Sequence, residues 1–176
     1  MTVKARGNDQ HHALLLYDYH EWANRKVIDH IRGLPDELWA KKVQSVFSSI
    51  QETFLHMIAA DTMWLDVMKQ KPFKEILENI TVHKNKLGNS SLEELAKAYS
   101  VLVNTSKQFF LQQNDLERLI ICDHPSFGRL ETPLSQCIQH VVNHGTYHRG
   151  NLASMIRQHG FAGVQTDYIT FLYNQK

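Results

Sequence analysis

The chain has 176 residues, 43% hydrophobic and 21% charged, a composition typical of one globular domain over residues 1–176 rather than of a disordered chain. Nineteen basic and eighteen acidic residues leave a net charge of +1, which argues against nucleic acid or an anionic membrane as a partner. No apolar run reaches the roughly 18 residues of a membrane span, and residues 1–10, expected to be frayed, carry no secretory segment. Cys122 and Cys137 make no disulfide framework, so we expect a cytoplasmic location.

In the first half of the chain, apolar residues repeat at helical spacing in two segments. The first segment spans about 11–32 and ends at Gly-Leu-Pro, residues 33–35. A short helical turn is expected over 36–42. The second helix starts at residue 48 or 49 with a capping-box pattern, Ser-Ile-Gln-Glu, and runs to about 69. Residues 70–90 are predicted to be a polar connection with one short turn.

The second half begins with a third helix, which opens at Ser91 with the capping-box pattern Ser-Leu-Glu-Glu and fades at 114–115. Residues 118–131 contain Leu-Ile-Ile and then His-Pro-Ser-Phe-Gly, which indicates an extended piece, a turn and a small hairpin. A short closing helix is predicted within 164–173, capped by Thr166 or Asp167.

The last long helix is predicted over 132–160. Thr132 is its expected N-cap, Pro133 stands at the first helical position, where a missing N–H costs nothing, and Gly160 supplies a left-handed C-cap. Its apolar residues recur every three or four positions and therefore need a partner surface. The four long amphipathic helices together predict an all-α four-helix bundle, with short extra helical turns and a small hairpin before the last long helix.

Three of the eleven histidines, His140, His144 and His148, follow one another at four-residue steps on this last helix. Each step turns the helix by about 400°, so the rings lie on one face. A triple with this spacing is expected by chance only about 0.04 times in a chain of this composition. Because neutral imidazole is a common ligand of zinc and other late first-row metals, a metal site is one interpretation of the stripe.

Two ligands from one helix rarely hold a metal alone, so a third is expected from a facing helix. His56 stands in the middle of the apolar second helix and is the candidate. Three imidazoles leave a coordination position for water or substrate, as in catalytic sites. The competing interpretation is a polar stripe, with His140 and His144 facing water and His56 hydrogen-bonded in the core. The spacing alone favours neither interpretation.

Three segments resemble the DinB/YfiT-like family of proposed metalloenzymes, in the order that the family shows them and over most of the chain. They are YDYHEWANRKVIDHI at 17–31, SIQETFLHMIAADTMWL at 49–65 and HVVNHGTYHRGN at 140–151. The family's usual His-Arg-Gly-Gln reads His-Arg-Gly-Asn here, which leaves the ligand positions untouched. The family name refers to induction by DNA damage and implies no DNA polymerase activity.

The resemblance implies a four-helix bundle, often a homodimer, that holds a divalent metal on three histidines. By position these are His56, His144 and His148, with His140 in a supporting or structural role and as the alternative ligand. Zinc or nickel is the expected ion, and manganese, cobalt and iron are the alternatives. Family members with an assigned activity include thiol S-transferases that act with low-molecular-weight thiols and a thiol-dependent isomerase.

We therefore expect a metal-dependent enzyme of the thiol S-transferase or hydrolase type, acting on a small molecule, with a low-molecular-weight thiol as co-substrate. Candidate catalytic helpers are Glu52, Tyr147 and Arg149. For Glu52 a capping role is the stronger interpretation, and for Arg149 a structural ion pair or hydrogen bond. The alternative function is a non-catalytic metal-binding or stress-response protein, whose site is structural or sensory.

Overall fold

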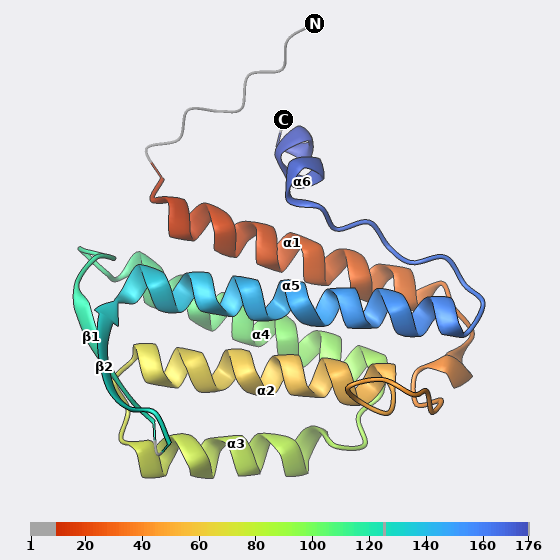
Figure 1. The fold of residues 1–176 in the computed structure, drawn as a ribbon, viewed down its shortest axis with the longest axis horizontal. Helices are drawn as coiled ribbons and strands as arrows, with labels where there is room; N and C mark the ends of the chain where they lie inside the picture. Colours follow the sequence, from red (N-terminus) through yellow and green to blue (C-terminus); the bar gives the residue numbers. More distant parts are fainter. Residues whose placement is uncertain (1–9, 125, 176) are drawn as a thin grey trace, which may run out of the picture.

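A computed structural model describes residues 10–124 and 126–175 of the protein (Figure 1). The expected fraying of residues 1–10 lies, except for the last of them, outside the described residues. Helices dominate, and one hairpin precedes the last long helix. In chain order the elements are α1 (His12–Arg32), the 3-10 helix η1 (Asp36–Leu38), α2 (Ile50–Met68), α3 (Phe73–Leu87), α4 (Leu92–Leu111), β1 (Leu119–His124), β2 (Gly128–Pro133), α5 (Leu134–Gln158) and α6 (Tyr168–Asn174).

Helices α1, α2, α4 and α5 form the bundle, which confirms the predicted all-α class. Helix α5 lies along both α1 and α2, and α4 packs behind these two (Figure 1). Helix α3 covers the outer side of α2, and α6 rests on α1. The bundle encloses a core of fully buried apolar side chains, among them Phe54, Leu95, Ile138, Leu152 and Met155. None of the helices in the described ranges is long and apolar enough to cross a membrane.

Both hydrogen bonds of the predicted capping box form at the start of α4, but only one of the two forms at the start of α2. At Ser91, the Oγ accepts the Glu94 amide at 3.3 Å and the Glu94 carboxylate accepts the Ser91 amide at 2.8 Å, a complete capping box. At α2, Ser49 Oγ accepts the Glu52 amide at 3.1 Å. The Glu52 carboxylate turns instead to the amide of Ser48, at 3.0 Å, so the box is not closed there.

The prediction for residues 70–90 is wrong, because α3 is a helix of 15 residues. Its apolar stripe is narrow: only Ile76 and Leu87 are buried, since the helix covers one side of α2 and faces solvent elsewhere. A hydrogen bond of 2.8 Å from Asn79 to Asp66 ties it to α2. Its stability comes from packing on α2, which a stripe of this width does not reveal. The helical turn expected over 36–42 shrinks to η1.

The predicted hairpin is confirmed. Strands β1 and β2 pair antiparallel, from Leu119 opposite Pro133 to His124 opposite Gly128. The strand residue Cys122 faces Cys137 of α5, with both thiols free and 3.7 Å between the Sγ atoms. The hairpin therefore closes one end of the bundle, beside the first turn of α5 (Figure 1).

The predicted start of the last long helix is corrected by one residue, because the N-cap is Pro133 rather than Thr132. Thr132 belongs to β2, and Pro133 takes the N-cap position, without a side-chain cap. The first two amides of α5 donate instead to the carbonyls of Arg118, at 3.0 Å, and Leu116, at 2.8 Å. A hydroxyl cap is not needed, because the preceding segment supplies these acceptors. The predicted left-handed conformation of Gly160 is confirmed by its φ of +88°.

Candidate metal centre

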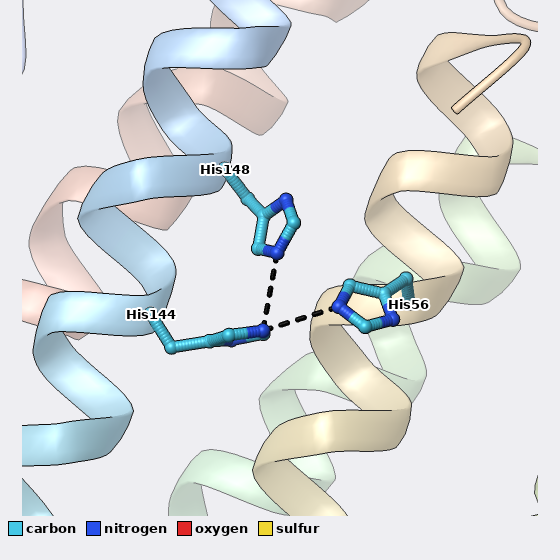
Figure 2. A group of neighbouring side chains, drawn as sticks. All are labelled: His56, His144 and His148. Carbon is cyan, nitrogen blue, oxygen red and sulfur yellow. Dashed lines mark hydrogen bonds between the residues drawn. The ribbon is translucent and has the colours of Figure 1, made fainter. Parts of the chain in front are cut away.

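The packing of α2 against α5 brings His56 opposite His144 and His148 (Figure 2). His144 and His148 lie one turn apart on α5, so their rings project from the same face. The Nε2 atom of His144 lies 3.1 Å from Nε2 of His56 and 3.1 Å from Nε2 of His148. Three nitrogen atoms therefore converge on one point between the two helices.

This donor set fits a divalent ion of the first transition row. The ligand atoms of His56, His144 and His148 all lie within 4.8 Å of one another. A tetrahedral zinc ion with bonds of about 2.0–2.1 Å places its nitrogen ligands about 3.4 Å apart, close to the 3.1 Å that separates His144 from each of the other two. Three imidazoles suit zinc, nickel or cobalt, whereas calcium and magnesium prefer oxygen ligands. The cluster is compatible with a divalent metal, although it does not identify which one.

Burial keeps the three imidazoles neutral. It is the main cause that lowers the pKa of His56 and of His144 below the usual value. For His148, burial followed by the neighbouring His144 and His56 lowers the pKa to about 4. A neutral imidazole presents a free lone pair, so at pH 7 all three rings are ready to bind a cation without first releasing a proton.

Aromatic rings border the cluster on two sides. Phe47, from the loop before α2, lies with its ring centre 4.7 Å from that of His56 and 5.6 Å from that of His148. Tyr147 lies 4.9 Å from His148 and is exposed. Nothing in the sequence indicated Phe47 as a neighbour of the site, because an aromatic residue in an irregular loop belongs to no periodic pattern that would show which way it faces.

Comparison with known proteins gives the same family as the resemblance in the sequence. The DinB family model matches residues 1–176. The chain belongs to the DinB family. Protein DinB of Bacillus subtilis strain 168 is 34% identical over 164 residues, which cover 93% of this chain and 95% of that protein. A crystal structure of a DinB-like protein from Bacillus cereus ATCC 10987 matches with a TM-score of 0.61 at 20% identity, covering 87% of this chain and 94% of the other; it shows the shared fold.

In this DinB-family chain the remaining histidine of the stripe, His140, lies outside the cluster of three. The ring of His140 is 4.4 Å from that of Trp64 and 6.2 Å from that of His144. It does not belong to the group of converging ligand atoms found in the described part of the chain. His140 is therefore packed on the Trp64 ring beside the cluster. The sequence feature that could have indicated Trp64 as a neighbour of the site was its place two turns after His56 on α2.

Glu52 is engaged at the start of α2. Its carboxylate accepts hydrogen bonds from Lys42 Nζ at 2.9 Å and from the Ser48 hydroxyl at 2.7 Å. The bonds from Lys42 and Ser48 lower the pKa of Glu52 to about 2. A carboxylate that is fully ionised and already bonded to a lysine is a poor general base. Its bonds go to Lys42 and Ser48 at the start of α2, although not to the Ser49 amide that a closed capping box would use.

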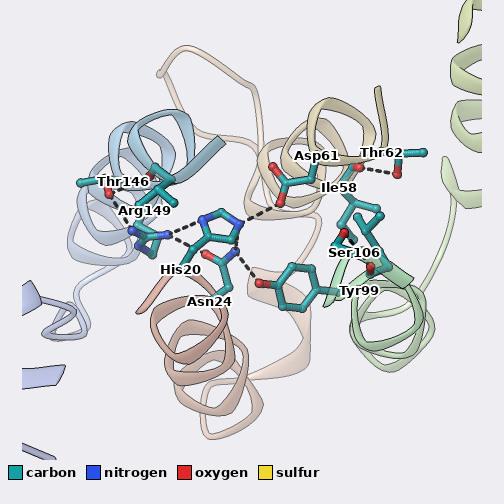
Figure 3. A network of polar contacts seen from close by, with 11 residues as sticks. His20, Asn24, Ile58, Asp61, Thr62, Tyr99, Ser106, Thr146 and Arg149 are labelled. Carbon is teal, nitrogen blue, oxygen red and sulfur yellow. Dashed lines mark hydrogen bonds and ion pairs between the residues drawn. The ribbon is translucent and has the colours of Figure 1, made fainter. Parts of the chain in front are cut away.

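Arg149 of this DinB-family protein is 2% exposed and points into the bundle between α5 and α1. Its guanidinium donates to Asn24 Oδ1 at 2.9 Å and to Thr146 Oγ1 at 2.7 Å (Figure 3). It also lies over the ring of Tyr19. These are the structural hydrogen bonds that the sequence analysis put ahead of substrate contact. A buried guanidinium held in this way joins two helices of the core.

The same interior holds a polar network that the sequence analysis missed (Figure 3). His20 of α1, fully buried, lies with Nε2 2.8 Å from Oδ2 of Asp61 on α2. Asn24 Nδ2 donates to the Tyr99 hydroxyl at 2.9 Å, and Arg149 closes the network from α5. The sequence feature that could have indicated this network was Asp61, an acidic residue inside the most apolar helix, since such a residue needs buried polar partners.

Proposed function

We propose that this DinB-family protein is a metal-dependent enzyme, whose divalent ion is held by His56, His144 and His148 and whose reaction is a thiol transfer or a hydrolysis. The observation that carries the proposal is the convergence of three Nε2 atoms from α2 and α5. When bound, zinc or nickel supplies a Lewis acid that lowers the pKa of a coordinated water or thiol.

The surroundings of the cluster support an open site rather than a closed structural one. Within the described ranges, the group of possible ligand atoms contains three residues and no cysteine or carboxylate. A structural zinc site normally has four protein ligands, whereas a catalytic one keeps a position for water or substrate. Phe47 shields one side of the rings, and the exposed Tyr147 marks a side that solvent reaches. Tyr147 is therefore the catalytic candidate that remains next to the ligand pair.

A low-molecular-weight thiol as co-substrate, and a homodimer as the working form, are the parts of the proposal that rest on the family resemblance alone. The chemistry is consistent with a thiol, because a metal ion with nitrogen ligands binds and stabilises a thiolate. Neutral ligands also leave the ion its full positive charge, which favours an anionic sulfur in the open position.

The test is metal content by mass spectrometry on protein purified without a tag or a nickel column. The parent should carry about one equivalent of a divalent metal, as expected for one mononuclear site. His56→Ala, His144→Ala and His148→Ala should each lose it. His140→Ala is the matched control, because it removes an imidazole from the same helix face but outside the cluster, and it should keep the metal.

A parent protein that stays free of metal after incubation with zinc, nickel and manganese would contradict the site. If the metal binds, thiol-transfer and hydrolytic substrates are tested with and without it. Activity that disappears with the metal supports the enzyme. A metal whose removal lowers the melting temperature sharply, with no activity under any condition, would favour a structural or sensory site instead.

A further inference from the structure

Two buried polar atoms without a hydrogen-bond partner lie on either side of the boundary between the metal centre and the polar network. Among the described residues, four buried side-chain atoms lack a partner, and these include Oδ1 of Asp61 and Nδ1 of His144. A buried carboxylate oxygen can only accept a hydrogen bond, and an imidazole nitrogen can donate one. An unsatisfied pair of this kind in a core needs an explanation, since buried polar groups are nearly always bonded.

The network holds one oxygen of Asp61. Nε2 of His20 lies 2.8 Å from Oδ2 of Asp61, and because a carboxylate oxygen can only accept, this ring nitrogen is the donor. Asp61, 5% exposed, is therefore held in place through one oxygen while its other oxygen stays free.

His144 is the ligand that meets both other imidazoles, and Nε2 is the atom by which it does so. A metal on Nε2 of a neutral ring leaves the ring proton on Nδ1. This atom then becomes a buried donor that requires an acceptor, as in most histidine–metal sites. Among the charged groups around His144, Asp61 has the largest influence on its pKa, which it raises against the effect of burial. The geometry agrees, because Gly145, the residue after His144, lies against His20: a Cβ there would be 2.5 Å from Nδ1 of His20, whose Nε2 is bonded to Asp61. Asp61 and His144 therefore both border the place where His20 of α1 meets α5.

We propose that Asp61 is a positioning residue of the metal site, which accepts the Nδ1 proton of His144 on its free oxygen when the ion binds. The inference rests on the metal site proposed above. It joins His20, Asp61 and His144 in one chain of hydrogen bonds from α1 through α2 to α5. It also places one negative charge beside an ion whose three ligands are neutral, which offsets part of the charge of the ion.

Asp61→Asn tests this role, because it replaces one of the two accepting oxygens by an NH2 group, which can only donate, so one of the two histidine N–H groups would face a donor. The affinity for zinc, measured by competition with a chromophoric chelator, should fall about 10–100-fold in this variant. Tyr99→Phe is the matched control. It removes a buried hydroxyl from the same network, one that bonds Asn24 and not Asp61, and should leave the affinity for zinc close to that of the parent.

A second measurement needs only the parent protein and remains valid if Asp61→Asn does not fold. In the zinc-loaded protein labelled with nitrogen-15, nuclear magnetic resonance should show a proton on Nδ1 of His144 in slow exchange with water. Zinc bound through Nδ1, or an Nδ1 proton in fast exchange, would overturn the inference, and so would equal losses of affinity in Asp61→Asn and Tyr99→Phe. A parent that binds no zinc would overturn the metal site itself, which is a distinguishable result.

Discussion

Gly145 of α5 lies directly against His20 of α1, and replacing it with alanine tests how tightly the polar network is packed. An added Cβ would lie 2.5 Å from Nδ1 of His20, closer still to its Cε1, and 3.0 Å from Nη1 of Arg149. Real Cβ atoms do not come this near to ring atoms, so His20 has to move. Its 2.8 Å contact with Asp61 would then be lost or lengthened.

Two effects of opposite sign decide the size of the change. Replacing glycine by alanine inside a helix stabilises it by about 1 kcal/mol. Against this gain, a buried hydrogen bond to a charged group contributes about 1.5–3 kcal/mol, and overpacking of a core costs about 1–3 kcal/mol. Gly145→Ala should therefore lower the free energy of unfolding by about 2–4 kcal/mol. For a chain of this length, such a loss lowers the melting temperature by roughly 4–16 °C.

Gly150→Ala in the same helix is the control, because nothing lies within 4 Å of a Cβ at that position. It should raise the free energy of unfolding by up to about 1 kcal/mol, the helical gain alone. Urea unfolding of the metal-free proteins, followed by circular dichroism, measures both changes. If Gly145→Ala is as stable as Gly150→Ala, the close contact of His20 with the α5 backbone does not constrain the core, and the reasoning is refuted.

Two further predictions follow from the pKa values of buried groups. The metal-free protein should lose on the order of 1–2 kcal/mol of stability between pH 7 and pH 5, because the pKa of His148 is lowered to about 4 while the unfolded chain takes up the proton near pH 6.5. Urea midpoints measure it, and the same loss in His148→Gln would assign the pH dependence to other groups. Burial raises the pKa of Cys137 to about 12 and that of Cys122 above its usual range, so iodoacetamide at pH 8 should label the native thiols at least about tenfold more slowly than the unfolded ones. Equal rates in the native and unfolded protein would contradict this.

The sequence alone determined the parts of the structure that depend on neighbouring residues. The capping box at Ser91, the left-handed Gly160 and the hairpin before α5 all follow from local backbone preferences, and all three are present. The spacing of His144 and His148 belongs to the same class, because four residues on a helix bring two side chains to one face whatever surrounds them. His56 was the candidate for the third ligand from its place in the apolar second helix and again from the family resemblance, and the structure brings it to the pair.

Tertiary packing decided the rest. Helix α3 is stabilised by packing its narrow apolar stripe against α2. The amides at the start of α5 donate to carbonyls of the segment before the hairpin rather than to Thr132. Which residues surround the histidines was equally hidden, since Asp61 and His20 come from different helices, and the position of His20 leaves no room for a side chain at Gly145. Periodicity specifies the face of one helix. The rotation of each helix against its neighbours, which decides which side chains touch, is set by the packing of the whole core.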